Sequence, residues 1–271
     1  MHYFLFGVSM SINIVEVPEQ EITLAILEEA FEMLKELAKG IDVIIAGAGP
    51  SGLVCAYYCA KAGLKTLVIE KLLHPGGGIP PGGMGFPRGI VASPADEILR
   101  EIECKLRKIR EGVYIFKTAD MFASLLKAAT SAGVEFLFGI YVEDLIYREK
   151  PLRVTGAVIN WTANLLSGLH MDPLMIPSKA VVDATGHDAE LLRIAQERIP
   201  NFPFKVKGHK GMCAYEGEKL VVEKSGEVIP GLYVTGMATA SLYGLPRMGP
   251  IFSSMLLSGK KVADEIIRKL K

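Results

Sequence analysis

The stretch DVIIAGAGPSG, residues 42–52, decides the fold of this 271-residue chain. The apolar run over residues 41–46 is typical of a parallel strand that is buried on both faces. Gly47, Gly49 and Gly52 follow it, in the spacing that permits a tight turn, close approach of the backbone to a phosphate and close packing of the next helix. The stretch therefore predicts the phosphate-binding turn of a dinucleotide-binding fold.

A carboxylate stands where such a fold needs one. Residues 66–70 are expected to form the second strand, which ends at Glu70. This is close to the offset of about 20 residues at which an acidic side chain holds the ribose hydroxyls of a dinucleotide. Flavoproteins of this fold usually carry another acidic residue in a late turn, where it forms a hydrogen bond with the ribityl chain of the flavin. The present sequence has Met237 at that position. Because a thioether is only a weak acceptor, Met237 favours NAD over FAD.

The rest of the chain alternates helices and strands, which predicts an α/β fold. An amphipathic helix is expected over residues 19–39. Further strands are expected at residues 114–116, 136–144, 154–161, 179–186 and 231–237, and further helices at residues 53–62, 96–107, 121–131 and 253–270. Three strands that run into glycine, with an inserted β-rich section, indicate the Rossmann-like fold of the two-dinucleotide-binding-domain flavoproteins. We expect a tail at residues 1–18 and a single dinucleotide-binding α/β domain at residues 19–271.

Composition narrows the class of partner and the compartment. Lys and Arg together number 30, as do Asp and Glu, so no basic surface for nucleic acid or for an anionic membrane is expected. Residues 1–9 are apolar but too few to span a bilayer, and Met10 is an equally good start, so they are expected to be an over-long start or a tail. The cysteines are Cys55, Cys59, Cys104 and Cys213. They form no CxxC pair, which favours core packing and a reducing, cytoplasmic compartment over disulfides or zinc.

A loop rich in glycine and proline, residues 75–87, follows the second strand. Its backbone can approach a ligand closely, because glycine carries no side chain. Apolar Ile79, Met84 and Phe86 are spaced through it, in place of the Ser, Lys and Glu of unstructured segments. We expect a ligand-binding loop here, with a disordered linker as the alternative.

Two short segments supply imidazoles and carboxylates. The first, GLHMDP, holds His170 and Asp172, and the second, TGHD, holds His187 and Asp188. Together they offer two imidazoles and two carboxylates to one site, and such donors suit a metal ion. From these residues alone, a turn cap at Asp172 and a hydrogen-bonded histidine at a helix start are the simpler interpretation.

Five motifs carry a resemblance to a known family. They are GAGPSG at residues 47–52, GMGFP at 83–87, LHMDP at 169–173, ATGH at 184–187 and PRMGP at 246–250. In this order they resemble the thiamine thiazole synthase family, over about residues 19–268. The resemblance implies an enzyme that converts NAD and glycine, with a sulfur source, into an adenylated thiazole carboxylate, the thiazole precursor of thiamine. NAD is then a substrate: nicotinamide leaves, and the ADP-ribose isomerises to a ketose, condenses with glycine, accepts sulfur and closes the ring.

His170 distinguishes two branches of that family. In the fungal and plant branch a cysteine stands at this position and surrenders its own sulfur once per protein molecule. Imidazole has no sulfur to give, so the chain resembles the archaeal branch, a sulfide-dependent ADP-thiazole synthase that turns over repeatedly. Cys213 is the alternative donor, but it lies outside the matching motif.

The resemblance also implies roles for individual residues. Asp172 and His187 align with ligands of Fe(II), and an oxygen and a nitrogen donor suit that ion. His170 is expected to be catalytic, orienting sulfide or shuttling protons. Arg247 is expected to grip the glycine carboxylate with its guanidinium. The implied NAD-binding residues are Gly47, Gly49, Ser51, Glu70, Lys71, Gly78, Val142, His170, Asp172 and Met237.

The family resemblance implies a homo-octamer with sites formed between neighbouring subunits. Two other functions use the same residues differently. One is an FAD-dependent oxidoreductase of the same fold, against which Met237 argues. The other is a non-catalytic NAD-binding sensor or scaffold, for which Asp172, His187 and Arg247 would be superfluous.

Overall fold

The computed structural model describes residues 14–271, so the expectation for residues 1–9 lies outside the described residues. The chain divides into two compact units, of which the first ends at Leu37 and the second runs from Ala38 to Lys271. Most of helix α1 (Glu19–Ala38) belongs to the first unit. The second unit runs from Ala38, and α1 buries only Leu37 of its side chains.

A mainly parallel sheet forms the centre of the second unit. Its strands are β1 (Ile41–Ala46), β2 (Thr66–Glu70), β6 (Glu135–Phe138), β9 (Leu174–Asp183), β11 (Gly226–Ile229) and β12 (Leu232–Val234). They lie in the order β11-β12-β9-β1-β2-β6, in which the β11–β12 pair is antiparallel and the others are parallel. The strands that run into glycine, β12, β9 and β1, are neighbours, so their carboxyl ends open on one edge.

The inserted β-rich section joins this sheet through β9. Strands β7 (Ile140–Glu149) and β8 (Leu152–Trp161) form an antiparallel pair, and β8 pairs with residues 174–177 of β9. From residue 178 onward, β9 pairs with β1. The sequence predicts one strand over residues 136–144, but β6 and β7 are separate strands because Gly139, with φ +68°, turns the chain between them.

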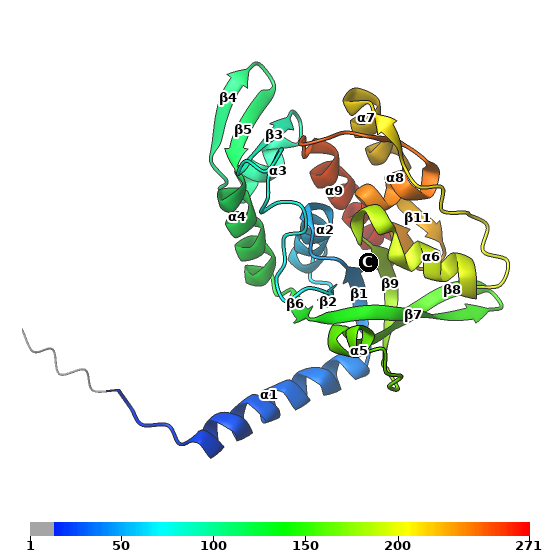
Figure 1. The fold of residues 1–271 in the computed structure, drawn as a ribbon. Helices are drawn as coiled ribbons and strands as arrows, with labels where there is room; N and C mark the ends of the chain where they lie inside the picture. Colours follow the sequence, from blue (N-terminus) through cyan, green and yellow to red (C-terminus); the bar gives the residue numbers. More distant parts are fainter. Residues whose placement is uncertain (1–13) are drawn as a thin grey trace, which may run out of the picture. The chain divides into compact units, whose positions relative to one another are not determined.

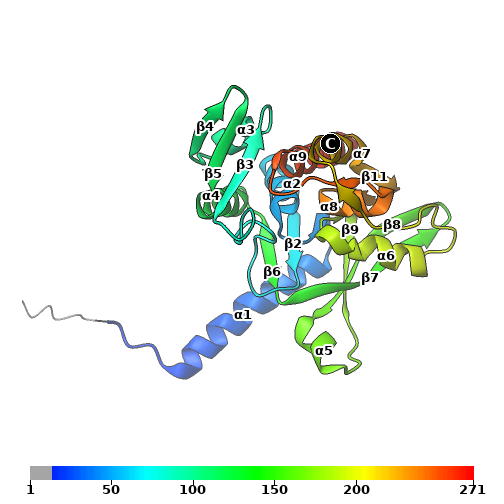
Figure 2. The same cartoon turned by 45° about the horizontal axis from the view of Figure 1, so that its top comes forward.

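Three helices cover one face of the parallel sheet: α2 (Pro50–Lys61), α4 (Thr118–Ser131) and α9 (Ser253–Leu270). Strands β7 and β8 lie on the other side (Figures 1 and 2). Fully buried apolar side chains fill the space between helices and sheet, among them Val43, Leu53 and Leu256. Helices α2 and α9 approach closely, because a Cβ on Gly259 would lie 2.4 Å from the carbonyl oxygen of Ser51.

A small antiparallel sheet, β3-β5-β4, follows the glycine-rich loop. It contains β3 (Arg88–Ala92), β4 (Leu106–Arg110) and β5 (Val113–Lys117), with helix α3 (Asp96–Glu101) between β3 and β4. The helix predicted over residues 96–107 is therefore wrong beyond Glu101, because Leu106 and the residues after it pair with β5. The remaining elements are α5 (Thr162–Ser167), the 3₁₀ turn η1 (Gly186–Asp188), α6 (Glu190–Arg198), β10 (Lys210–Met212), α7 (Ala214–Lys224), α8 (Met237–Tyr243) and β13 (Pro246–Arg247).

The cysteines form no disulfide. Cys55, Cys59 and Cys104 are buried, as the core-packing interpretation of the first two predicts, and Cys213 is exposed. Burial raises the pKa of Cys104 to about 12. Within residues 14–271, no helix combines the length and the apolar character that crossing a bilayer requires.

Candidate active site

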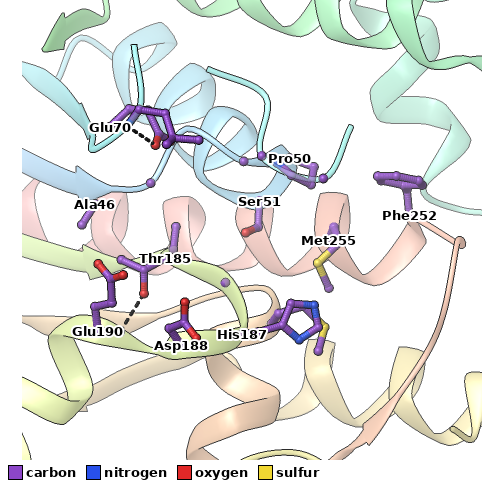
Figure 3. Close-up of a pocket in the computed structure, with 18 of the residues that line it drawn as sticks. Ala46, Pro50, Ser51, Glu70, Thr185, His187, Asp188, Glu190, Phe252 and Met255 are labelled. Carbon is purple, nitrogen blue, oxygen red and sulfur yellow. Dashed lines mark hydrogen bonds between the residues drawn. The ribbon is translucent and has the colours of Figure 1, made fainter. Parts of the chain in front are cut away.

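A cavity of about 540 Å³ opens at the carboxyl ends of β1, β2 and β9 (Figure 3). Segments far apart in the sequence line it: the turn after β1, the end of β2, the glycine-rich loop, the turn after β9 and the chain from Arg247 to Met255. Its volume lies in the range of about 300–1,000 Å³ that is usual for small-molecule sites. Open α/β sheets bind their ligands at this edge.

The turn after β1 is shaped by contacts that leave no room for side chains. Gly47 has φ +103°, and a Cβ on it would lie 2.4 Å from the carbonyl oxygen of Ala184. A Cβ on Gly52 would lie 2.1 Å from the carbonyl oxygen of Gly47. Gly49 differs, because no atom lies within 4 Å of the position that its Cβ would occupy. A side chain at Gly47 or Gly52 would therefore displace the backbone of this turn, and Gly49 keeps the cavity open.

Helix α2 points its N-terminus at the cavity. It begins with Pro50, and among the described residues no side chain caps it. Its first-turn N–H groups and its dipole can therefore hold an anion. Ser51 projects from the same turn (Figure 3). Its Oγ packs against Gly236, which has φ +63°, and a Cβ on Gly236 would lie 2.3 Å from that oxygen. This end of the cavity is suited to a phosphate group.

Glu70 links the end of β2 to the turn after β1. Its side chain is buried and lines the cavity. Its Oε2 accepts the backbone N–H of Ala48 at 2.9 Å, and its Oε1 accepts that of Leu72 at 3.0 Å. Each carboxylate oxygen keeps a second lone pair, with which it can accept a ribose hydroxyl. Glu70 can thus support the fold and a ligand together.

Lys71 and Glu190 form an ion pair on the cavity wall. The hydrogen bond to Glu190 raises the pKa of Lys71. The backbone carbonyl of Lys71 accepts a hydrogen bond from Thr162 Oγ1 at 2.8 Å, which ties β2 to α5. Glu190 was not identified from the sequence, and its position at the start of a helix just after His187 is the signal that could have revealed it.

Buried hydrogen bonds hold the turn after β9. Asp183 accepts from the N and Oγ1 of Thr185, at 3.0 and 2.6 Å, and from the N of Leu192 at 3.0 Å. Thr185 Oγ1 in turn accepts the N–H of Glu190 at 2.8 Å. Burial raises the pKa of Asp183, against the lowering effect of these hydrogen bonds. The turn that carries His187 is therefore held in place by its own chain.

His187 projects from this turn into the cavity (Figure 3). Its carbonyl oxygen accepts a hydrogen bond from Ser241 Oγ of α8 at 2.6 Å. Its ring Nδ1 lies 2.8 Å from Nε2 of His209. Partial burial, together with the neighbouring His209 and Arg247, lowers the pKa of His187. The neutral imidazole that this favours is the form that can bind a metal.

Arg247 brings a free guanidinium to the cavity. It lies on β13, which pairs with β10, and its side chain is exposed. Within residues 14–271 the guanidinium has no carboxylate partner. A guanidinium in this setting can bind a ligand carboxylate through two parallel hydrogen bonds.

The segment with His170 and Asp172 lies away from the cavity. Neither residue lines it, and their side chains are 86% and 103% exposed. Asp172 precedes the amino end of β9 and His187 follows its carboxyl end. Because the ten residues of β9 span about 33 Å, one chain cannot bring the two segments to one site.

All the other residues implicated by the sequence line the cavity together. They are Gly47, Gly49, Ser51, Glu70, Lys71, Gly78, Val142, His187, Met237 and Arg247. The loop of residues 75–87 is ordered against the turn after β1, since Gly76 N donates to Ala48 O at 2.8 Å. The cavity is therefore assembled from the residues that the motifs predict, except for the segment before β9.

Comparison with known proteins identifies the family. The Thi4 family matches residues 23–252. The chain belongs to the Thi4 family. It is 52% identical over 259 residues to a thiamine thiazole synthase of Metallosphaera sedula, across 96% of this chain and 95% of that relative. It is 48% identical over 263 residues to a thiamine thiazole synthase of Sulfolobus acidocaldarius, across 97% and 99%.

The fold comparison agrees with this family. The chain is similar to the crystal structure of Thermovibrio ammonificans THI4, with a TM-score of 0.91 and 40% identity, over 94% of this chain and 99% of that one. The predicted Rossmann-like α/β fold and the resemblance carried by the five motifs are thereby confirmed. The Sulfolobales source of the two sequence relatives agrees with the archaeal branch.

In this member of the Thi4 family, the donors fit Fe(II) in kind. His187 offers an imidazole in the cavity, and Asp172 offers a carboxylate that is fully exposed. A single chain does not assemble them, and within residues 14–271 no group of three or more His, Cys, Asp or Glu side chains could hold a metal ion. A metal site that used both residues would therefore need donors from a second copy of the chain.

Some residues around the Thi4 site were not assigned a role from the sequence. Met248 and Met255 line the cavity, as does Asp188 of the second histidine segment, and Ser241 and His209 hold His187. His209 lies outside the five motifs. Only the pairing of β10 with β13 brings its segment to the cavity.

Proposed function

We propose that this chain is a sulfide-dependent ADP-thiazole synthase, which consumes NAD and glycine, requires Fe(II) and releases nicotinamide. The observation that carries the proposal is the cavity itself. It combines a phosphate-binding turn, the carboxylate of Glu70, the imidazole of His187 and the free guanidinium of Arg247. Membership of the Thi4 family supports an enzyme of thiazole formation.

The chain's own residues bind NAD at the β1–α2 edge. The pyrophosphate lies at the N-terminus of α2, where the turn at Gly49 leaves space and Ser51 adds a hydroxyl donor. Glu70 accepts the ribose hydroxyls, and Lys71 lies beside it. Val142 and Met237 supply apolar contacts. The dinucleotide is oriented with its reacting ribose toward the turn after β9.

The opposite part of the cavity receives glycine. Arg247 holds its carboxylate, because a guanidinium forms paired hydrogen bonds with a carboxylate. His187 and Asp172 hold Fe(II), which supplies Lewis acidity and open positions for substrate when bound. His170 moves protons or orients sulfide close to neutral pH.

Free sulfide is the sulfur source because the chain offers no suitable cysteine. No cysteine lines the cavity among the described residues. Cys55, Cys59 and Cys104 are buried, and the pKa values of Cys55 and Cys104 are raised, which disfavours the reactive thiolate. Cys213 is exposed, but it precedes α7 and does not line the cavity.

A neighbouring copy supplies Asp172 and His170 to each site. In one chain these side chains face solvent, at the far end of β9 from His187. Apolar side chains around them are exposed as well, namely Leu165, Leu166, Leu169, Met171 and Met175. Such a patch is typical of a protein interface. We propose a closed homo-oligomer, a homo-octamer by family resemblance, with sites between neighbours.

The test is an anaerobic incubation of the purified protein with NAD, glycine, sulfide and Fe(II). Mass spectrometry measures the adenylated thiazole, and sulfide and iron are omitted in turn. We expect several molecules of product per chain, and none when either component is left out. The mass of the protein should not change, because no side chain loses sulfur.

Other outcomes would replace the proposal. Product without added sulfide, with loss of sulfur from Cys213, would identify a protein-derived donor. Release of nicotinamide without thiazole would indicate a different chemistry of ADP-ribose. If NAD were not consumed and the purified protein absorbed light at about 450 nm, an FAD oxidoreductase would be favoured.

A further inference from the structure

Two histidine rings meet at the edge of the cavity. Nδ1 of His187 and Nε2 of His209 are 2.8 Å apart, the ring centroids are 4.7 Å apart, and the ring planes are inclined by 37°. The distance is that of a hydrogen bond. His209 itself does not line the cavity, whereas His187 does. The contact therefore joins a side chain of the cavity wall to one outside the lining.

One buried residue of α8 positions both histidine segments. Ser241 is fully buried, and its Oγ donates to the carbonyl oxygen of His187 at 2.6 Å. The carbonyl oxygen of Ser241 accepts the N–H of Lys207 at 3.0 Å. On the other side of His209, Lys210 N donates to Leu245 O at 2.9 Å. The backbone on both sides of the ring contact is thus anchored, so the contact follows from the fold.

The contact decides which nitrogen of His187 is available to a metal. A neutral imidazole has one N–H and one lone pair, so one ring must donate to the other. If Nδ1–H of His187 donates to Nε2 of His209, Nε2 of His187 keeps its lone pair. If His209 donates instead, the proton of His187 is on Nε2, which then cannot bind a metal. Metal-binding histidines commonly donate their other N–H to such an acceptor.

We propose that His209 is a positioning residue for His187: it accepts the Nδ1–H of His187, and so selects the tautomer and ring orientation that present Nε2 to a divalent metal. The inference rests on the proposed function, in which His187 is a ligand of Fe(II). It adds a residue outside the five family motifs. His209 itself binds neither the metal nor the substrates.

The experiment is a titration of the full-length oligomer with Co(II), a spectroscopic substitute for Fe(II), without substrates. Visible absorption reports both the affinity and the coordination geometry. We expect His187→Ala to remove binding. His209→Ala should lower the affinity by about 10- to 100-fold and change the absorption spectrum, because an outer partner usually contributes that much. His209→Gln should restore most of both, since its amide oxygen can accept the same N–H.

Matched controls separate positioning from general damage. His74→Ala removes a histidine that lies outside the cavity lining and whose Nδ1 is 3.2 Å from the carbonyl oxygen of Pro75, and it should leave Co(II) binding unchanged. NAD binding and the melting temperature of the His209 variants should stay near those of the wild type, because His209 is exposed. Loss of either property in His209→Ala and His209→Gln alike would assign His209 to the fold and overturn the inference.

Three further results would overturn it. Unchanged affinity and spectrum in His209→Ala would show that the contact has no effect on the metal. Complete loss in both His209 variants, as in His187→Ala, would make His209 a ligand, since two nitrogens on one metal also lie about 3 Å apart. No Co(II) binding by the wild type would instead contradict the metal assignment of the proposed function, and this inference with it.

Discussion

The turn after β9 and the segment before it carry similar side chains in opposite surroundings. After β9, Thr185 donates a hydrogen bond to the buried Asp183, His187 accepts one from the buried Ser241, and both residues line a cavity. Before β9, His170 and Asp172 face solvent. The backbone between them is held by the carbonyl oxygen of Met171, which accepts a hydrogen bond from the side chain of Asn160 at 3.0 Å.

The difference shows that the two ends of β9 carry different parts of the candidate site. The carboxyl end of the sheet is complete within the chain, because every strand that borders it contributes a turn. The amino end of β9 presents donors with nothing around them to bind. A site that uses both must take each half from a different copy. The predictions below test this division, from the largest effect to the smallest.

The largest effect is expected when a residue is replaced in either half of the proposed shared site, before or after β9. Asp172→Asn and His187→Ala should each lower thiazole formation by about 100-fold or more, since each removes a proposed metal ligand. Asp172→Asn should leave the melting temperature unchanged, because its side chain is fully exposed. Co-expression of the two variants should restore roughly a quarter of the wild-type activity, because random mixing leaves that share of shared sites intact.

The control for this experiment is co-expression of two differently tagged copies of His187→Ala, which should stay inactive. If the mixed Asp172→Asn and His187→Ala assembly also stays inactive while both variants assemble normally, the sites are not shared between copies. If either single variant keeps full activity, the corresponding residue is not a ligand.

A smaller effect is expected at the phosphate-binding turn. Gly52→Ala places a Cβ 2.1 Å from the carbonyl oxygen of Gly47 and should lower the free energy of unfolding by about 2–4 kcal/mol. Gly49→Ala is the matched control, because its Cβ meets no atom within 4 Å. It should melt like the wild type yet bind NAD about tenfold more weakly, since the methyl group occupies the space of the pyrophosphate. Calorimetry measures the stability of each variant, and titration with NAD measures its affinity. If Gly49→Ala bound NAD as tightly as the wild type, the pyrophosphate would not lie at this turn.

The smallest effect concerns Glu218 of α7, which holds the first turn of α9 beside the cavity. Its carboxylate accepts from Ser254 Oγ at 2.5 Å and from Ser254 N at 3.0 Å. Burial raises the pKa of Glu218 above the usual 4.5, so the folded state keeps a proton that the unfolded state loses in this window. The free energy of unfolding should therefore fall as pH rises from 4.5 through the folded pKa.

Glu218→Gln should remove this fall. The amide can accept from Ser254 N and donate to Ser254 Oγ, so the contacts remain while the titration is lost. We expect a free energy of unfolding that matches the wild type at the acidic end and exceeds it above the folded pKa by less than about 1 kcal/mol, measured by denaturant unfolding at each pH. Parallel pH profiles for the two proteins would show that Glu218 titrates normally.

Much of the fold was readable from local patterns. The first strand, the glycine turn and helix α2 were predicted because apolar runs and glycines determine local backbone conformation and burial. Helix 96–107 was mispredicted, since residues 106–110 satisfy their backbone hydrogen bonds in a sheet with residues 113–117. Nothing in the local sequence indicates that pairing. The helices α7 and α8 were not predicted either.

By itself, the sequence determined the strand–turn–helix unit, the carboxylate at Glu70 and, through five motifs, the family. Only the tertiary structure decided which side chains share a site. It places His187 beside Arg247 and His209, and it separates His187 from Asp172 by the length of β9. The reason is physical: side-chain periodicity is a local property, whereas the distance between two segments depends on which strands become neighbours in the sheet.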